Sequence, residues 1–363
     1  MATNYKTLTS LTAGSQYQYR VTAIGDGTTY TDSDPSAIAT FATLTPLDVP
    51  TGLALTPSTN QIAANWTAVA NATAYVLAYV TGNGNWTEIE VANNTYTLSG
   101  TAQGANYSFK VKAIAPNTAY EESAFSSVVS TTTLIQLATP APTLTRTNDS
   151  ITVSWAAIAH ATGYKVSWKL SGGNYTEVDV ATTSFTLDNL QEGQTYVFKV
   201  QAVTTDAAYV ASEYSAEVSD STKITLATPA PTLTKTTSTI TATWSAIPNA
   251  EAYVVAYKTG TATFTETTTT STSYTLDELQ PGVTYVIKVK ATTTDPDYLD
   301  SAFSSERSAT TLIPLDTPTN VAADQITSNS ARIGFDPVAN ATKYRIQYRI
   351  VGTQEWQEIE VTP

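Results

Sequence analysis

The sequence predicts an all-β chain of tandem antiparallel β-sandwiches arranged in a linear rod. One pattern returns at nearly constant spacing, because Tyr17, Tyr107, Tyr196 and Tyr285 are separated by 90, 89 and 89 residues. Such spacing indicates an internal repeat of one domain length. After Tyr196, apolar Phe198, Val200 and Ala202 alternate with polar residues, as in a half-buried strand. No stretch has the periodicity of an amphipathic helix.

The composition excludes several classes of function. Charged residues make up 13% of the 363 residues, against about 25% in an average globular protein. The 18 basic and 31 acidic residues give a net charge of −13, and the basic residues are scattered, so nucleic acid is not expected as a partner. Without cysteine there is neither a disulfide framework nor a thiolate metal site. No apolar run is long enough to predict a membrane span.

Domain boundaries are predicted from proline-containing segments that recur at one phase: LDVPTG at Leu47, LATPAP at Leu137 and Leu226, and LDTPTN at Leu315. We expect three complete domains between two halves, namely the C-terminal half of a domain at 1–46, complete domains at 47–136, 137–225 and 226–314, and the N-terminal half of a domain at 315–363. Proline fixes φ, so these short joints predict a semi-rigid rod.

The strand order within one repeat is clearest at 137–225. Ile151, Val153 and Trp155 alternate along one strand, and after a turn Tyr164 and Val166 share one face of the next. About seven short strands in 89 residues, separated by turn residues, are typical of an antiparallel β-sandwich.

Three recurring features identify a family. They are an early-strand tryptophan, a tyrosine on the next strand, and a Leu-x-x-Gly-x-x-Tyr corner: Trp66, Trp155, Trp244; Tyr75, Tyr164, Tyr253, Tyr344; Leu190, Gly193, Tyr196 and Leu279, Gly282, Tyr285. On these residues the whole chain resembles the immunoglobulin-like fibronectin type III family. Thr101 in place of the corner leucine and Phe335 in place of the tryptophan are departures that we interpret as core variation. The loop from Ala23 to Ser36 resembles arrays in large bacterial surface proteins, which implies an extracellular or cell-surface location.

Catalytic and metal-binding chemistry has little support. The only histidine, His160, replaces an asparagine at a turn that recurs in the other repeats, so we interpret it as a turn residue. One histidine without cysteine cannot build the usual triads or zinc sites. Acidic residues such as Asp295, Asp297 and Asp300 cluster in loops, where they could bind structural calcium or simply face solvent. Their irregular spacing favours the solvated loop. No enzyme, metal or cofactor is expected.

Exposed aromatic residues are the better candidates for binding. Trp86, Tyr175, Phe264 and Trp356 occupy one position, after the turn that follows the tyrosine strand. Such side chains can stack on glycans or anchor a surface protein. The alternative is that each ring covers the sandwich edge, and recurrence in four repeats favours that alternative. No Arg-Gly-Asp is present, so the attachment motif of some family members cannot be carried over.

The two terminal segments are predicted to be complementary halves of one domain. Each half is too short to bury a stable core alone, and each leaves strand edges open for pairing. The hypothesis is a head-to-tail homopolymer; the rival is completion by neighbouring domains of a longer chain. The interface residues would be Tyr17, Tyr19, Val21, Ile333, Phe335, Tyr344, Ile346 and Tyr348. The sequence thus predicts a non-enzymatic extracellular spacer or fibre, with an adhesin or a carbohydrate- or protein-binding array as the alternative.

Overall fold

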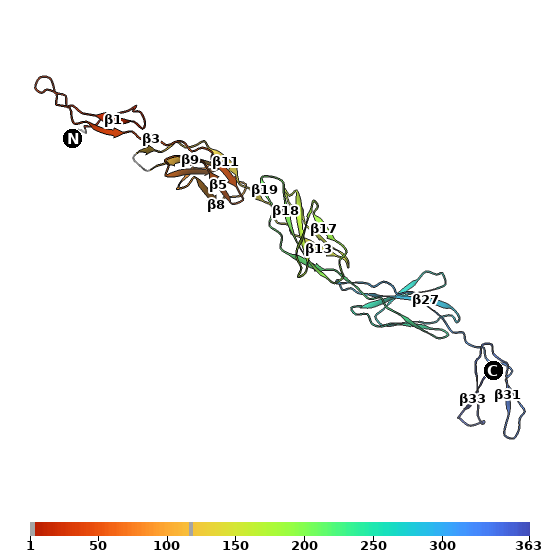
Figure 1. Ribbon diagram of the computed structural model, residues 1–363. Helices are drawn as coiled ribbons and strands as arrows, with labels where there is room; N and C mark the ends of the chain where they lie inside the picture. Colours follow the sequence, from red (N-terminus) through yellow and green to blue (C-terminus); the bar gives the residue numbers. More distant parts are fainter. Residues whose placement is uncertain (1–3, 116–118) are drawn as a thin grey trace. The chain divides into compact units, whose positions relative to one another are not determined.

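The computed structural model describes residues 4–115 and 119–363. Within these residues every regular element is a β-strand (Figure 1), which confirms the all-β prediction. None of the described residues forms a helix of the length and apolarity that a membrane crossing needs. The chain divides into two compact units: the first comprises Met1–Thr145, Thr152–Leu187 and Tyr196–Asp220, and the second comprises Arg146–Ile151, Asp188–Thr195 and Ser221–Pro363. The five domain segments and the rod stay predictions.

Residues 47–136, in the first unit, form two facing antiparallel sheets. The smaller sheet has the order β4(Ala54–Pro57), β5(Gln61–Asn65), β8(Thr95–Ser99). The larger has the order β11(Val129–Thr132), β9(Asn106–Ile114), β6(Ala74–Thr81), β7(Thr87–Val91). Inward side chains such as Ile62, Leu77 and Phe109 are fully buried. Trp66 packs edge-on against Tyr75, with ring centroids 5.4 Å apart.

The same two sheets recur further along the chain, as alternation of apolar and polar residues requires. In the next sandwich the smaller sheet has the order β13(Thr143–Arg146), β14(Ile151–Ser154), β17(Ser184–Leu187). The larger sheet has the order β16(Thr176–Val180), β15(Gly163–Leu170), β18(Thr195–Val203), β20(Val218–Ser221). Trp155 lies edge-on to Tyr164 at 5.2 Å. The seven strands of these two sheets match the number expected for one sandwich.

The second unit contains a further sandwich. Its smaller sheet has the order β22(Thr232–Lys235), β23(Ile240–Thr243), β26(Ser273–Leu276). Its larger sheet has the order β25(Thr265–Thr269), β24(Ala252–Thr259), β27(Thr284–Thr292), β29(Arg307–Thr310). Ile240, Val255 and Val289 are fully buried between them, and Trp244 meets Tyr253 edge-on at 5.3 Å. The core therefore uses the same positions in each repeat.

Short strands precede each sandwich and pair in parallel with a later segment. These pairs are β3(Thr45–Pro46) with β10(Tyr120–Glu121), β12(Ile135–Gln136) with β19(Tyr209–Val210), and β21(Ile224–Thr225) with β28(Tyr298–Leu299). They bring Leu47, Leu137 and Leu226 into buried positions.

Two turn predictions hold in the structure. His160 has φ of 63°, and its counterparts Asn71, Asn249 and Asn340 have φ of 64°, 63° and 67°. Asparagine tolerates this left-handed conformation, so His160 is the turn residue that the sequence predicted. At the corner, Gly193 and Gly282 have φ of 70° and 73°, where glycine avoids the steric cost that a Cβ brings.

The described residues of the terminal segments form only two-stranded sheets, one in 4–46 and two in 315–363. In 4–46, β1(Gln16–Tyr19) pairs with β2(Ala39–Ala42). In 315–363, β30(Ala322–Asp324) pairs with β31(Arg332–Gly334), and β32(Tyr344–Tyr348) with β33(Gln357–Val361). These segments expose many of their apolar side chains.

Candidate functional site

The four predicted binding aromatics each come directly before a strand. Trp86 precedes β7, Tyr175 precedes β16, Phe264 precedes β25 and Trp356 precedes β33. Each ring lies against a cationic side chain. The aromatic position is therefore part of a cation–aromatic cluster on the outer face of the larger sheet.

In residues 47–136 the cluster is built on Lys110 of β9. Its Nζ lies 4.4 Å from the ring centroid of Trp86 and 4.4 Å from that of Phe125. Lys112 approaches Phe125 at 5.5 Å and also forms an ion pair with Glu122. Trp86 stays 38% exposed. Two rings thus flank one ammonium group, while one of them keeps contact with solvent.

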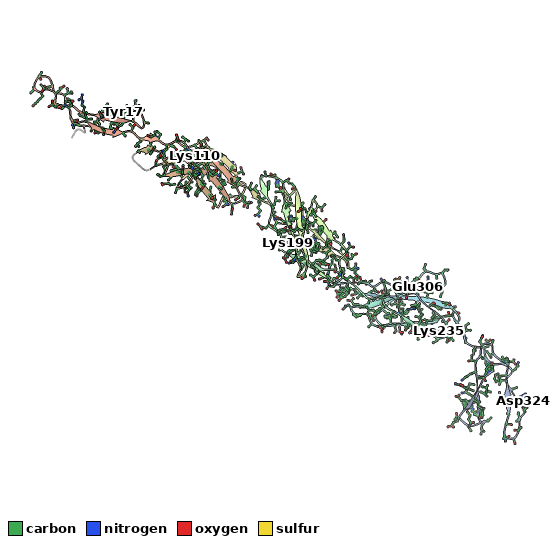
Figure 2. The ribbon with its side chains drawn as sticks, in the orientation of Figure 1. Tyr17, Lys110, Lys199, Lys235, Glu306 and Asp324 are labelled. Carbon is green, nitrogen blue, oxygen red and sulfur yellow. The ribbon has the colours of Figure 1, made fainter. Side chains whose placement is uncertain are left out.

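The second cluster surrounds Lys199 of β18; Lys110 and Lys199 are both labelled in Figure 2. The Nζ of Lys199 lies 4.2 Å from the Tyr175 centroid and 4.6 Å from that of Tyr214. Lys169 adds a second cation 4.3 Å from Tyr175. Each hydroxyl donates to a carboxylate, Tyr175 to Glu217 and Tyr214 to Glu177.

These surroundings change the titration of both tyrosines. Burial, followed by the hydrogen bond to Glu217, raises the pKa of Tyr175 to about 12. Burial and the bond to Glu177 also raise the pKa of Tyr214. Both effects disfavour the phenolate, so the two hydroxyls remain donors well above neutral pH.

The third cluster lies on β24 and β27 of the second unit. The Nζ of Lys288 is 4.1 Å from the Phe264 centroid and 4.6 Å from that of Phe303. Lys258 lies 4.5 Å from Phe264, and Lys290 forms an ion pair of 3.3 Å with Asp300. The arrangement repeats the first cluster with phenylalanine in place of tryptophan.

The central lysines of the three clusters contact aromatic rings and form no ion pair with a carboxylate of the described residues. Within the described ranges, no carboxylate comes within ion-pair distance of Lys110, Lys199 or Lys288. Exposed cation–π contacts contribute about 0.5–1 kcal/mol each. The contacts favour a role for the aromatics in covering the sheet, and their role in binding glycans or proteins stays a prediction.

Trp356 has a less complete cluster. Arg349 lies 4.5 Å from its centroid, in the place that Lys169 and Lys258 take in the other repeats. The ring is 55% exposed. It is the most exposed of the four predicted aromatics.

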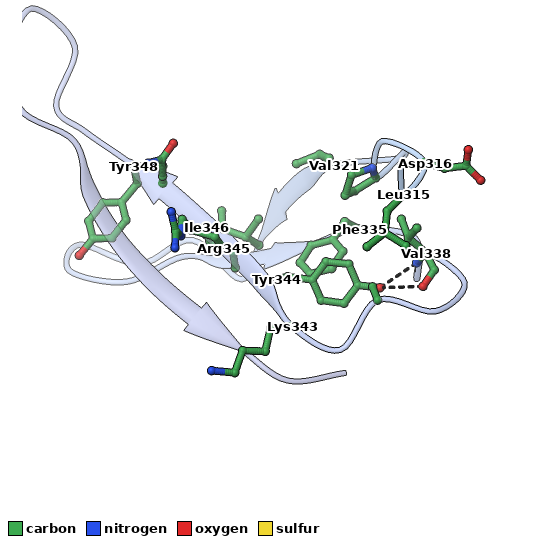
Figure 3. A pocket seen from close by; sticks show the side chains of 14 residues that line it. Leu315, Asp316, Val321, Phe335, Val338, Lys343, Tyr344, Arg345, Ile346 and Tyr348 are labelled. Atoms are coloured by element: carbon green, nitrogen blue, oxygen red, sulfur yellow. Dashed lines mark hydrogen bonds between the residues drawn. The ribbon is translucent and has the colours of Figure 1, made fainter. Parts of the chain in front are cut away.

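The predicted interface residues of 315–363 line an apolar cavity. Its volume is about 560 Å³, and its walls include Leu315, Ile333, Phe335, Tyr344, Ile346 and Tyr348. Figure 3 shows the rings of Phe335 and Tyr344 beside each other, with dashed lines joining the Tyr344 hydroxyl to Val338. The ring centroids are 4.6 Å apart, and the hydroxyl accepts the Val338 N–H at 2.7 Å.

The predicted interface residues of 4–46 gather on the β1–β2 hairpin. Tyr17 stacks on Phe41 at 5.6 Å, and Tyr19 approaches the same ring at 6.0 Å. Tyr19 is 47% exposed and Val21 66% exposed. Two separate segments of the chain therefore each present an open apolar surface.

Comparison with known proteins shows which family two of these sandwiches represent. A family model described as the fibronectin type III domain matches residues 140–218 and 229–302. Both regions are fibronectin type III domains. The resemblance inferred from the sequence is thereby confirmed for this part of the chain.

Several known proteins contain similar sequences. Fibronectin type III domain-containing protein 7 of Mus musculus is 30% identical over 147 residues, covering 39% of this chain and 19% of that protein. Tenascin-N of Homo sapiens is 25% identical over 331 residues, covering 87% of this chain and 24% of that protein. Tenascin-N of Mus musculus is 26% identical over 319 residues, covering 84% of this chain and 19% of that protein. The chain spans about a fifth to a quarter of the length of these relatives.

Among solved structures, the crystal structure of chicken CNTN1 FN1-FN3 domains aligns with 74% of this chain and all of that chain. The identity is 17% and the TM-score is 0.35. The resemblance of the Ala23–Ser36 loop to bacterial arrays stays a prediction.

Acidic side chains in two of the predicted loops accept hydrogen bonds from the backbone of their own loops. Asp26 Oδ1 accepts the N–H groups of Thr28, Thr29 and Tyr30, which lowers the pKa of that carboxyl. Asp295 accepts the N–H of Asp297 at 2.9 Å. In the parts of the chain that the structure describes, no three carboxylate or histidine side chains gather as a metal site would require.

Sequence reasoning found the four aromatics but missed their partners. Lys110, Lys199 and Lys288 recur 89 residues apart, as do Phe125, Tyr214 and Phe303. This second periodicity was a usable signal. His160, predicted to be a turn residue, also stacks on Tyr209 of β19 at 4.2 Å, a contact between a turn and a short strand that no spacing indicates.

Proposed function

We propose that the chain is a non-enzymatic structural array of fibronectin type III domains at the cell surface or outside the cell. The matched domains are of a non-catalytic module type, and the similarity to tenascin-N extends over most of the chain. The repeats bury equivalent core positions, and among the described residues none of their charged side chains is buried. A row of such modules suits a spacer or a fibre.

We further propose that one copy of the chain completes another, head to tail. The observation that carries this proposal is that apolar residues left partly or fully exposed in the terminal segments correspond to residues that lie in or against the core of the complete domains. Ile346 corresponds to Leu77, which is fully buried. Tyr348 corresponds to Tyr79, whose ring centroid lies 6.0 Å from that of Phe109.

Residues 4–46 carry the other part of the same core. Tyr19 and Val21 correspond to Phe109 and Val111, both fully buried. Tyr19 of one copy would therefore meet Tyr348 of a second. Burial of each large apolar side chain stabilises such a contact by about 1.5–3 kcal/mol before the cost of association.

The N-terminal segment is already shaped like the back of a domain. Val21 N–H donates to Ser36 Oγ at 3.1 Å, as Val111 N–H donates to Ser126 Oγ at 3.1 Å. Tyr17 Oη accepts the Thr12 N–H at 2.7 Å, in the manner of the Tyr107 corner. Little rearrangement would precede binding, which lowers the entropic cost of association.

The strand edges are complementary as well. In residues 47–136 the larger sheet has the order β11, β9, β6, β7. The corresponding strands are β2 and β1 in one segment and β32 and β33 in the other. A second copy would join them in the order β2, β1, β32, β33. Unpaired strand edges are templates for pairing of this kind, and a contact between unlike surfaces propagates into a filament unless it closes into a ring.

Sedimentation of the 363-residue chain over a range of concentrations tests the assembly. We expect the mean mass to rise with concentration for the unchanged chain. Ile346→Asp places a charge in the apolar cavity and should leave monomers. Val351→Asp is the control, because Val351 is 99% exposed and lies outside the cavity. A chain that stays monomeric at every concentration contradicts the proposal and favours completion by other domains.

A further inference from the structure

The cation–aromatic cluster has a fixed construction in the complete domains. Its central lysine lies three residues after the corner tyrosine, as Lys110 follows Tyr107 and Lys199 follows Tyr196. Its first ring comes from the residue just before an edge strand of the larger sheet. In the clusters of Lys199 and Lys288, the ring at this position also contacts a second cation, Lys169 or Lys258. In these two clusters, two cations thus contact one ring.

The terminal segments contain the parts of a fourth cluster, on separate surfaces. Arg20 lies three residues after the corner tyrosine Tyr17. It is exposed, and among the described residues no carboxylate or aromatic ring contacts it. Trp356 has its first cation in Arg349. Among the residues that the structure describes, no second cation contacts this ring as Lys199 or Lys288 contacts its ring.

Residues 4–46 also lack a ring of their own for Arg20. In residues 47–136 the second ring is Phe125, which lies two residues after Ser123. The Oγ of Ser123 accepts the N–H of Ala113 on β9. The corresponding position after Ser33 is Pro35. The position that supplies the second ring in the complete domains therefore supplies none to Arg20.

We infer that Arg20 of one copy stacks on Trp356 of a second copy, beside Arg349, and so completes the fourth cluster. This inference rests on the proposed head-to-tail assembly and names a polar contact on its outer face. A guanidinium is planar and weakly hydrated, which suits stacking on an indole ring. Because tryptophan is the strongest of the aromatic cation binders, the pair would favour this orientation of the two strand pairs over a slipped register.

The test is a double-mutant cycle on the full chain, measured by sedimentation. Arg20→Ala and Trp356→Ala should each weaken association about 3- to 30-fold, the range that a cation–π contact of roughly 0.6–2 kcal/mol gives. The double variant should be no weaker than the more affected single variant. Arg332→Ala and Trp86→Ala are matched controls, because Arg332 pairs with Asp324 within its own segment and Trp86 belongs to a complete domain. Both controls should associate as the unchanged chain does.

The results distinguish failure of the Arg20–Trp356 contact from failure of the head-to-tail assembly. Association that is unaffected by Arg20→Ala and Trp356→Ala, or losses that simply add in the double variant, would overturn the Arg20–Trp356 contact and leave the assembly standing. A chain that never associates would overturn both. Arg20→Glu gives a second check, because a carboxylate facing the negative face of the indole should weaken association more than alanine does.

Discussion

Replacing Ser167 with alanine should stabilise the protein. Ser167 lies in the middle of β15, is 0% exposed, and its Oγ has no hydrogen-bond partner. Its cross-strand neighbours are Glu177 and Lys199. The corresponding residues of the other repeats, Ala78 and Ala256, are also 0% exposed and have the same kind of neighbours. Alanine therefore fits this site without rearrangement.

The size of the effect follows from two opposing contributions. A buried hydroxyl without a partner costs about 1–3 kcal/mol. Removing one heavy atom from this packed site on the outer face of the sheet loses roughly 1 kcal/mol of contact. We expect Ser167→Ala to raise the free energy of unfolding by about 1 kcal/mol, which corresponds to a rise of roughly 4–8 °C in the melting temperature of a domain of this size.

Scanning calorimetry of the full chain measures this change. If the domains unfold separately, only one transition should move upward. Ala256→Ser is the reciprocal control and should lower a different transition by a comparable amount. A decrease in stability for Ser167→Ala would refute the reasoning, because it would mean that the hydroxyl makes a favourable interaction in the folded domain.

Three further results are expected. Trp155→Ala should cost about 3–5 kcal/mol, because the indole is buried against Tyr164; an unchanged urea midpoint would place Trp155 outside the core. Millimolar calcium added to chelated protein should not raise the melting temperature, since a ligand that binds only the native state must stabilise it; a large rise would reveal a calcium site. The raised pKa of Tyr175, about 12 against 10.0 for free tyrosine, should add stability that is complete below pH 10 and is lost as the pH rises through 12. Tyr175→Phe should lessen that alkaline loss in thermal melts, and an identical pH profile would show that Tyr175 does not contribute.

The sequence was sufficient for features that depend on local pattern. Alternation in the residues after Tyr196 predicted a strand with one buried face, and the structure has that strand as β18. The asparagine at the equivalent turns predicted the role of His160, since only a few residue types tolerate positive φ. In both cases one short segment contained the physical constraint.

The cation–aromatic clusters could not be assembled from local pattern. Trp86, Lys110 and Phe125 come from three segments, and they meet only because β6 places β7 and β9 on its two sides. Pairing registers of this kind are set by the whole sandwich. The 89-residue recurrence of the lysines marks the positions, but it does not say which side chains face each other.

Hydrogen exchange on the full chain at low and high concentration tests the head-to-tail contact most directly. In residues 47–136 the strands equivalent to β1 and β32 are β9 and β6, which pair with each other over eight residue positions. If one copy completes another, amides in 16–19 and 344–348 should gain protection together as concentration rises, while those of β6 and β9 stay unchanged. Exchange in β1 and β32 that is independent of concentration, in a sample shown to associate, would contradict the account.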